Sequence, residues 1–470
     1  MLPVFAEGFF RLHERFFGRG TFEALKGLRQ SERWPCDRIE SLQLARLRDL
    51  VSHAWQRTDY WRHAMESRGI TPETVRSLED LKRFPLLTKE DIRVHRERMV
   101  WRGEGRRVKL ARTSGSTNAS LEFYTSSSRE AYITAARMRG HNWVGIRPGD
   151  KEMYFWAAPL EASTQDRIKQ VRDWLRNDGF TNALNLTGER VREYVKHWEA
   201  WRPACLFGYV SSFIVLARLA SQMHIDLKPL RTAGLKAIVT TSEMLGANRA
   251  TIEQAFHVPV YDSYGIREVG LIAHECEHGT LHTNDELLLL ETIHPRTLEP
   301  TDGEGELVAT SLTSNCMPII RYRTGDIVRM SRALCACGRS LGSVCMTGGR
   351  LMEFILTRHG KWVSCVAFIY VCRMVKGVRQ IQARQDRQGQ IRVLVAKDAD
   401  FPADGVEQIH RAVRARLEDD DEILVEILDE IPPAPSGKQR IVISSVTQNA
   451  LAGDAGGAGS PGPRGEFPAE

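Results

Sequence analysis

Apolar residues in the first hundred positions recur with the period of an α-helix. In the segment 41–66 they follow one another at three- and four-residue spacings, which predicts a helix with one buried face. Thr88, followed three residues later by Asp91, is typical of a helix N-cap. Charged residues interrupt the apolar ones in the segment 1–20, which predicts an amphipathic helix and argues against a signal peptide. Residues 1–100 are therefore expected to form a helical lead-in.

From about residue 105 the pattern alternates between short β-branched runs and helical periodicity. Strands are predicted at 107–112, 121–124, 152–156, 237–240 and 258–261, and helices at 128–143, 211–223 and 248–256. Such alternation favours an α/β fold with a largely parallel sheet.

After about residue 285 the pattern changes to strands joined by turns. A more antiparallel part is expected there, with strands at 286–293, 307–311 and 319–322 and a turn at 301–306. The segment 354–447 reads as a small α+β domain, with strands at 379–384, 390–396 and 422–428, a turn at 386–389 and a helix at 405–417. The segment 448–470 is rich in Gly, Ala and Pro and is expected to be a disordered tail.

The composition is typical of a folded, enzyme-sized chain. The 470 residues suggest two or three domains at ~150 residues each. Lys and Arg exceed Asp and Glu by 65 to 59, and these charges are dispersed, which argues against nucleic-acid binding. No uninterrupted apolar run reaches ~18 residues, so no membrane span is expected. Nine cysteines are too sparse and irregular for a disulfide scaffold, which favours a reducing cytoplasm.

Four short segments carry candidate chemistry. The hydroxyl-rich turn Thr113-Ser-Gly-Ser-Thr117 could cradle phosphate oxygens, although such turns are common in ordinary loops. Glu268, beside a glycine turn at a strand end, suits Mg²⁺ but also fits a solvated turn. Asp326, placed by a tight glycine turn, could bind ribose hydroxyls or merely cap a β-turn. Lys438, in a Pro- and Gly-containing loop, could deliver a charge to a distant site or simply be a solvated surface lysine.

In this order and at these separations, the four segments resemble the motifs of the adenylate-forming superfamily. The matching sequences are Thr113-Ser-Gly-Ser-Thr117, Tyr264-Gly-x-x-Glu268, Tyr322-Arg-Thr-Gly-Asp326 and Ser436-Gly-Lys438. The chain is most similar to the phenylacetate-CoA ligase family and its capsule-biosynthesis, CapK-like branch, over roughly residues 40–445. This resemblance implies an adenylate-forming catalytic domain at 1–348, a hinge at 349–353 and a small mobile domain at 354–447.

The resemblance also implies roles for individual residues. Lys438, Glu268 and Thr117 would be catalytic, with Glu268 holding Mg²⁺ and Lys438 reaching the α-phosphate. Tyr264 would stack on adenine, Asp326 would bind the ribose, and Arg350 would mark the hinge. The rest of the expected ATP site is Thr113, Ser114, Gly115, Ser116, Ser242, Glu243, Asp262 and Gly265.

A cluster of cysteines and histidines indicates a second metal. Cys335-Ala-Cys337 and His274-Glu-Cys276-Glu-His278 concentrate the ligands that tetrahedral Zn²⁺ prefers, although free thiols in a reduced cell remain the alternative. Similar pairings in relatives of the resembled family favour Cys276, His282, Cys335 and Cys337 as the structural zinc ligands, with His278 as the substitute for His282.

The leading functional hypothesis is ATP-dependent activation of a small carboxylic acid, followed by transfer to coenzyme A. A second hypothesis passes the adenylate to an amine or a carrier-protein thiol in polysaccharide or natural-product biosynthesis. A third is a non-catalytic nucleotide-binding scaffold, suggested by Asn118 and Met352, which depart from the family pattern.

The sequence gives less information about the acid and about partners. The acyl pocket is expected near 156–159, 207–212 and 240–242, where aromatic residues would suit an aromatic or apolar acid or simply form core. The N-terminal helix is rich in phenylalanine and could pack on a second subunit or on a membrane surface.

Overall fold

The structure is a computed structural model, and part of the sequence-predicted site lies outside the residues that it describes. The described residues are 1–103, 108–112, 121–157, 171–295, 297–347, 354–365, 367, 368, 371, 374–431 and 440–452. The predicted phosphate loop Thr113–Thr117, the hinge with Arg350, and Lys438 fall outside these ranges.

The lead-in is helical, as the periodicity predicted. Its α-helices are α1 (Pro3–Phe16), α2 (Thr21–Ser31), α3 (Cys36–Arg57), α4 (Asp59–Glu66) and α5 (Lys89–Met99), with 3₁₀ helices η1 (Pro72–Thr74) and η2 (Leu78–Arg83). The single helix predicted over 41–66 is wrong, because Thr58 has an extended backbone (φ −132°) and divides α3 from α4. Thr88 caps α5, since its hydroxyl accepts a hydrogen bond from the Asp91 N–H. None of the described helices is both long and apolar enough to cross a bilayer.

One large sheet runs through the first compact unit, which comprises the described residues up to 347. Its strand order is β11-β12-β13-β14-β10-β9-β8-β7-β6-β3-β4. The part from β4 to β8 is parallel and consists of β4 (Asp178–Asn182), β3 (Glu152–Trp156), β6 (Cys205–Tyr209), β7 (Ala237–Thr241) and β8 (Val260–Ile266). This arrangement confirms the predicted α/β fold with a parallel region.

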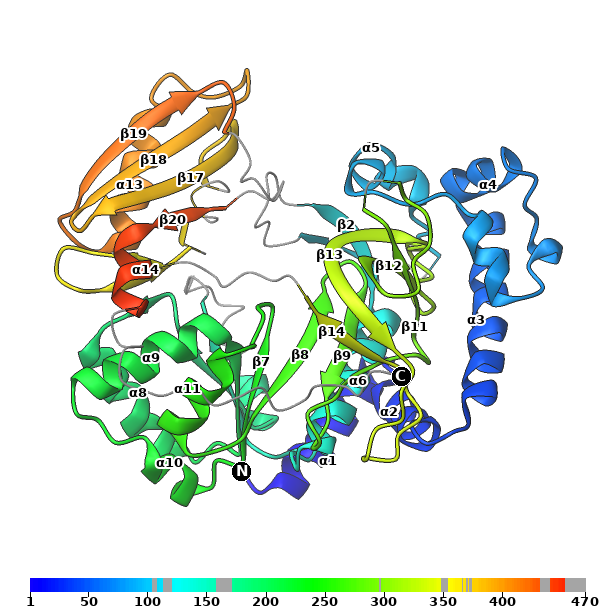
Figure 1. The fold of residues 1–470 in the computed structure, drawn as a ribbon, viewed down its shortest axis with the longest axis horizontal. Helices are drawn as coiled ribbons and strands as arrows, with labels where there is room; N and C mark the ends of the chain where they lie inside the picture. The colour runs from blue at the N-terminus through cyan, green and yellow to red at the C-terminus, as the bar shows by residue number, and fades with distance from the viewer. Residues whose placement is uncertain are drawn as a thin grey trace. The chain divides into compact units, whose positions relative to one another are not determined.

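The first unit also contains helices and short strands outside the large sheet (Figure 1). They are α6 (Ser127–Trp143), α8 (Gly188–Trp201), α9 (Val210–Gln222), α10 (Lys228–Ala233) and α11 (Asn248–Phe256), with the hairpin of β1 (Val108–Arg112) and β2 (Glu122–Ser126) and the two-residue strand β5 (Asn185–Leu186). Within the described residues, helices connect β4 to β6, β6 to β7 and β7 to β8, as parallel pairing requires.

The other half of the sheet is antiparallel, as predicted after about residue 285. It consists of β9 (Gly270–Glu275), β10 (Leu281–Thr283), β14 (Ser343–Met346), β13 (Tyr322–Ser331), β12 (Glu304–Ser311) and β11 (Leu288–Ile293). The strand expected at 319–322 is wrong, because pairing begins only at Tyr322. The turn expected over 301–306 is also shorter than predicted, since β12 already begins at Glu304.

A large apolar core joins the lead-in helices to this antiparallel half. Leu47, Trp61, Phe123, Leu307 and Tyr322 belong to one buried cluster. Tyr322 is 0% exposed, so the strand that carries Asp326 is anchored in this core.

A second compact unit begins in the described chain at residue 354. It contains the hairpin β15 (Phe354–Leu356) and β16 (Trp362–Ser364), and a sheet of β19 (Glu422–Leu428), β18 (Gln390–Lys397), β17 (Val378–Arg387) and β20 (Val442–Ser444). Helix α13 (Gly405–Leu417) packs on β19. Helix α14 (Ser445–Ala452) continues past residue 447, where the sequence predicted a disordered tail.

Candidate active site and metal cluster

Two residues of the predicted nucleotide site meet although their strands, β8 and β13, are not adjacent in the large sheet. The Tyr264 hydroxyl, on β8, donates a hydrogen bond of 2.8 Å to Oδ2 of Asp326, on β13. Burial, reinforced by the Asp326 charge, raises the pKa of Tyr264 well above its usual value. Tyr264 therefore stays a neutral donor and fixes the orientation of the Asp326 carboxylate.

Glu268 is a buried carboxylate in the turn between β8 and β9. It is 4% exposed, and its Oε1 accepts a 2.9 Å hydrogen bond from the Tyr322 hydroxyl. Arg129 of α6 donates to the backbone carbonyls of Arg267, at 2.9 Å, and Glu268, at 2.8 Å. Within the described chain no hydrogen bond engages Oε2 of Glu268. A buried carboxylate whose orientation is fixed is a ligand type that suits Mg²⁺.

Glu268 lies in a turn at a strand end, as the sequence predicted, but Gly265 and Gly325 lie within strands rather than in turns. Residues 262–266 continue β8, whose register against β9 shifts between Tyr264 and Gly265. Residues 322–326 begin β13, where Gly325 has a positive φ of 77°. A left-handed residue inside a strand is typical of a β-bulge, which redirects the next side chain. The irregular strand pairing therefore redirects the side chains that follow the two glycines, which the sequence had predicted for turns.

Asp262 lies on β8 two residues before Tyr264, in a partly buried polar environment. Its Oδ1 accepts hydrogen bonds from the Thr240 hydroxyl, at 3.0 Å, and from the Ser263 N–H, at 2.9 Å. Burial raises the pKa of Asp262 to about 7; the Thr240 hydrogen bond opposes this shift and the Glu275 charge adds to it. This carboxyl group therefore titrates near neutral pH.

Ser242 and Glu243 follow β7 but differ in their surroundings. Ser242 is exposed and has a positive φ of 68°. Both carboxylate oxygens of Glu243 accept hydrogen bonds from Ser211 near the start of α9, one from the N–H (2.6 Å) and one from the hydroxyl (2.7 Å). A carboxylate at a helix N-terminus is stabilised by the helix dipole. The described contacts of Glu243 therefore point to helix stabilisation.

Aromatic side chains gather at the carboxyl ends of β3 and β6, where the acyl pocket was expected. The Trp156 and Tyr209 ring centroids are 4.1 Å apart, and Trp156 stacks on Phe207 at 6.0 Å with an interplanar angle of 15°. Ligands of parallel α/β sheets bind at this edge.

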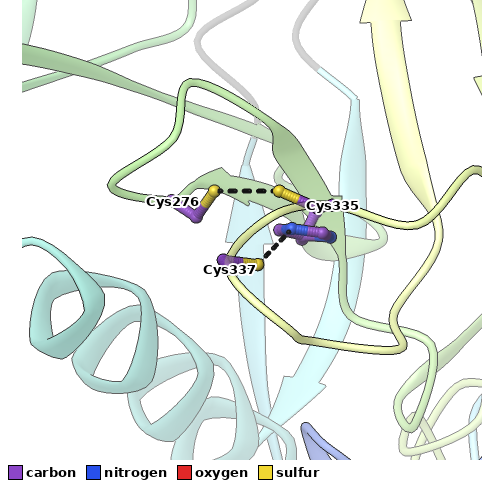
Figure 2. Close-up of side chains that lie close together, drawn as sticks. Cys276, Cys335 and Cys337 are labelled. Atoms are coloured by element: carbon purple, nitrogen blue, oxygen red, sulfur yellow. Dashed lines mark hydrogen bonds between the residues drawn. The ribbon is translucent and has the colours of Figure 1, made fainter.

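The predicted zinc ligands come together in the first unit. One ligand atom each from Cys276, His282, Cys335 and Cys337 lies within 4.8 Å of all the others. The Cys276 and Cys335 sulfurs are 3.8 Å apart, and His282 Nε2 is 3.2 Å from the Cys337 sulfur. Figure 2 shows the three cysteine side chains pointing toward one another. Two sulfurs of a tetrahedral zinc site lie about 3.8 Å apart, so the geometry fits zinc rather than a disulfide.

The surroundings of this cluster also suit a metal. His282 Nδ1 faces the carbonyl oxygen of Leu341 at 3.1 Å, so a proton on Nδ1 leaves Nε2 free to act as a ligand. The N–H groups of His278 and Arg339 lie 3.4 and 3.5 Å from the sulfurs of Cys276 and Cys337. Burial alone would raise the pKa of the Cys335 thiol, but hydrogen bonds outweigh it and lower that pKa. His278 therefore contacts the cluster through its backbone, whereas His282 presents its ring.

Sequence reasoning did not assign a role to several residues that organise these sites. Tyr322 orients Glu268, Arg129 holds the turn, and Thr240 bonds Asp262. Tyr322 stood within a recognised motif, but nothing in the pattern indicated which carboxylate it contacts. Arg129 is 138 residues from its partner Arg267, a separation that no local pattern can bridge.

Comparison with known proteins shows what this chain is similar to. The sequence model of the CapK C-terminal domain matches residues 355–445. Protein CapK of Staphylococcus aureus is 23% identical over 439 residues, covering 90% of this chain and 92% of CapK. Phenylacetate-coenzyme A ligase of Aromatoleum evansii is 26% identical over 370 residues, covering 77% of this chain and 81% of that enzyme. The chain is thus similar to phenylacetate-CoA ligases and to CapK over most of its length, and its segment 355–445 matches the CapK C-terminal domain.

Solved structures of a CoA ligase share the fold of this chain. The structure of 2-hydroxyisobutyryl-CoA ligase in its postadenylation state, with an acyl-AMP bound, superposes with a TM-score of 0.57 at 18% identity. The alignment covers 91% of this chain and 94% of that ligase. The same ligase with 2-HIB-AMP and CoA, in the thioesterification state, gives a TM-score of 0.58.

Proposed function

We propose that the protein activates a small carboxylic acid with ATP to form an acyl adenylate, and then transfers the acyl group to coenzyme A. The observation that carries this proposal is the hydrogen bond between Tyr264 and Asp326, beside Glu268 and its partner Tyr322. Tyr264 and Glu268 come from one motif and Asp326 from another, and each of the three stands where the resemblance to the superfamily expects a nucleotide- or Mg²⁺-binding residue.

In the first step the carboxylate of the substrate attacks the α-phosphorus of ATP and pyrophosphate leaves. The substrate is already ionised at neutral pH, so no general base is needed. Asp326 would accept hydrogen bonds from the ribose hydroxyls, and Tyr264 would keep that carboxylate oriented. Mg²⁺ held by Glu268 would neutralise charge on the phosphate oxygens.

In the second step the thiol of the acceptor attacks the acyl carbon of the adenylate, and AMP leaves. We assign Lys438 to the first step only, so that a movement of the C-terminal unit would withdraw it and admit the thiol. The Thr113–Thr117 segment would contact the β- and γ-phosphates through hydroxyl and backbone N–H groups.

We further propose that Cys276, His282, Cys335 and Cys337 bind a structural zinc ion. The support is the 3.8 Å sulfur–sulfur distance together with the orientation of the His282 ring. Four protein ligands close a tetrahedral site and leave no position for substrate, so the ion would stabilise the fold rather than take part in acyl transfer.

The acid that best fits the aromatic side chains at the expected pocket is planar or apolar. Trp156, Phe207 and Tyr209 pack against one another near the carboxyl edge of the sheet, and an aromatic environment favours aromatic or aliphatic acyl groups over charged ones.

Pyrophosphate exchange into ATP, measured over a panel of aromatic and aliphatic acids, tests the first step. We expect exchange with at least one acid, with dependence on Mg²⁺ and loss in Glu268→Gln. If no acid supports exchange, in protein that retains its zinc and its fold, the result would favour the non-catalytic scaffold instead.

The CapK relationship favours a second candidate for the acceptor. The C-terminal match to CapK falls on the unit that would admit the acceptor, so an amine or a carrier-protein thiol could replace CoA. Exchange without release of an acyl-CoA product would identify this route, whereas acyl-CoA formation at a comparable rate would exclude it.

A further inference from the structure

Helix α1 carries an apolar stripe that faces away from the protein. Residues three and four apart share one face of a helix, and Leu2, Phe5, Phe9, Leu12 and Phe16 follow this spacing. Phe5 is 64% exposed, Leu12 is 67% exposed and Phe16 is 83% exposed. Such a row of large exposed apolar side chains is unusual on a monomeric protein and indicates an interaction surface.

The opposite face of α1 fixes the helix to the first unit. Ala6 and Phe10 are buried, and the Phe10 ring packs edge-on against Phe22 of α2 at 5.2 Å. The guanidinium of Arg176 lies 3.8 Å from the centroid of the Phe10 ring. The Asn177 side chain donates a 3.0 Å hydrogen bond to the carbonyl of Met1. These contacts hold the helix in place, so the apolar stripe faces outward.

The charges of α1 are arranged to suit an anionic partner. Glu7 pairs with Arg11 at 2.6 Å, and the buried Glu14 accepts hydrogen bonds from Thr21 and Arg19. Both acidic side chains of the helix are thus neutralised. Arg15 is exposed and has no carboxylate partner among the residues that the structure describes, which leaves a positive charge beside the stripe.

The area of the stripe distinguishes between two kinds of partner. Side chains of this size and exposure can bury on the order of 500 Å². A standard protein interface buries about 800 Å² on each partner, so the stripe alone is too small for a stable dimer. A lipid surface needs no complementary partner, and phenylalanine and leucine with flanking arginine are typical of helices that lie in the bilayer interface.

We propose that α1 docks the protein on an anionic membrane surface, with the stripe inserted among the acyl chains and Arg15 near the lipid phosphates. The attachment is peripheral, and it would bring the acyl-activating site close to a membrane-bound acceptor or product.

Co-sedimentation of the full chain with vesicles tests this inference. We expect binding to vesicles of equal parts phosphatidylcholine and phosphatidylglycerol, and at least about tenfold weaker binding to phosphatidylcholine alone. The double variant Phe5→Glu/Phe16→Glu should lose about tenfold or more in affinity. Val94→Glu is the matched control, because Val94 lies on helix α5 and is 64% exposed, as Phe5 is. This control variant should bind vesicles as the wild type does. Arg15→Gln should weaken binding by about fivefold and reduce its salt dependence.

The inference is overturned if the wild type does not sediment with either vesicle, or if the double variant binds as tightly as the wild type. Sedimentation velocity supplies a second readout. A wild-type dimer that the double variant converts to a monomer, without vesicle binding, would identify a second copy of the chain as the partner instead.

Discussion

At the scale of single residues, the site depends on hydroxyl groups that orient carboxylates. Tyr264 orients Asp326, Tyr322 orients Glu268, and Thr240 bonds Asp262. Each hydroxyl is a neutral donor, so it fixes the position of the carboxylate without cancelling its charge. A bound nucleotide or cation can then use the full charge of Asp326 and Glu268.

Asp326→Ala tests the ribose assignment. The variant lacks the carboxylate that would accept two hydrogen bonds from the ribose, and hydrogen bonds to a charged group contribute about 1.5–3 kcal/mol. We expect the KM for ATP to rise about tenfold or more, with a smaller effect on the KM for the acid. The matched control is Asp302→Ala, at an exposed position in the turn before β12. An unchanged ATP dependence in Asp326→Ala would contradict the ribose role.

Asp262→Asn tests the titration of the buried carboxyl group. The pKa of Asp262 is raised from 3.8 to about 7 by burial, so between these values the folded protein binds more protons than the unfolded chain. The free energy of unfolding of the wild type should therefore fall, relative to the variant, as the pH rises from 3.8 to about 7, and then stay level. The total difference should reach at most about 4 kcal/mol.

Chemical denaturation of both proteins across this pH range measures the effect. Asparagine keeps an oxygen that can accept the Thr240 hydrogen bond, so the comparison isolates the charge. Parallel stability curves for the wild type and Asp262→Asn would show that the carboxyl group does not titrate in this range.

At the scale of elements, the cysteine cluster joins segments that are distant in the chain. Cys276 follows β9, His282 lies on β10, and Cys335 and Cys337 precede β14. Strand β9 also pairs with β8, which carries Tyr264. A metal at this cluster would therefore stabilise the hairpin on which the nucleotide site is built.

Cys337→Ala tests this link. We expect loss of about one equivalent of bound zinc and a decrease in the free energy of unfolding of about 3 kcal/mol or more. Cys205→Ala is the matched control, because Cys205 is also a buried cysteine but lies outside the cluster, and it should retain its zinc. Metal analysis and thermal unfolding with and without a chelator measure both effects. Wild-type protein that contains far less than one equivalent of zinc would exclude the site.

At the scale of the whole molecule, the chain divides into two compact units, and the proposed reaction needs both. The first unit contains Tyr264, Glu268 and Asp326, and the second corresponds to the CapK C-terminal domain over 355–445. Two chemical steps in one site require that different groups reach the α-phosphate region in turn.

Lys438→Ala tests whether Lys438 acts in the adenylation step only. We expect adenylation to fall by at least about 100-fold, because the variant lacks the charge that stabilises the transition state at the α-phosphate. Formation of thioester from a supplied acyl adenylate should change much less. Lys376→Ala, at an exposed lysine of the same unit, should leave both half-reactions intact. Equal loss of both half-reactions in Lys438→Ala would contradict the assignment.

The sequence by itself determined the α/β class and most element types, because periodicity and caps are local properties of the chain; the roles of the site residues stay predictions. Helix α11, strand β3 and helix α13 have the predicted bounds. Only the tertiary structure decided that Tyr264 and Asp326 lie within strands, that Tyr322 contacts Glu268, and that the His282 ring rather than the His278 ring joins the cysteines. These outcomes depend on strand register, β-bulges and contacts between residues far apart in the chain, which no local pattern encodes.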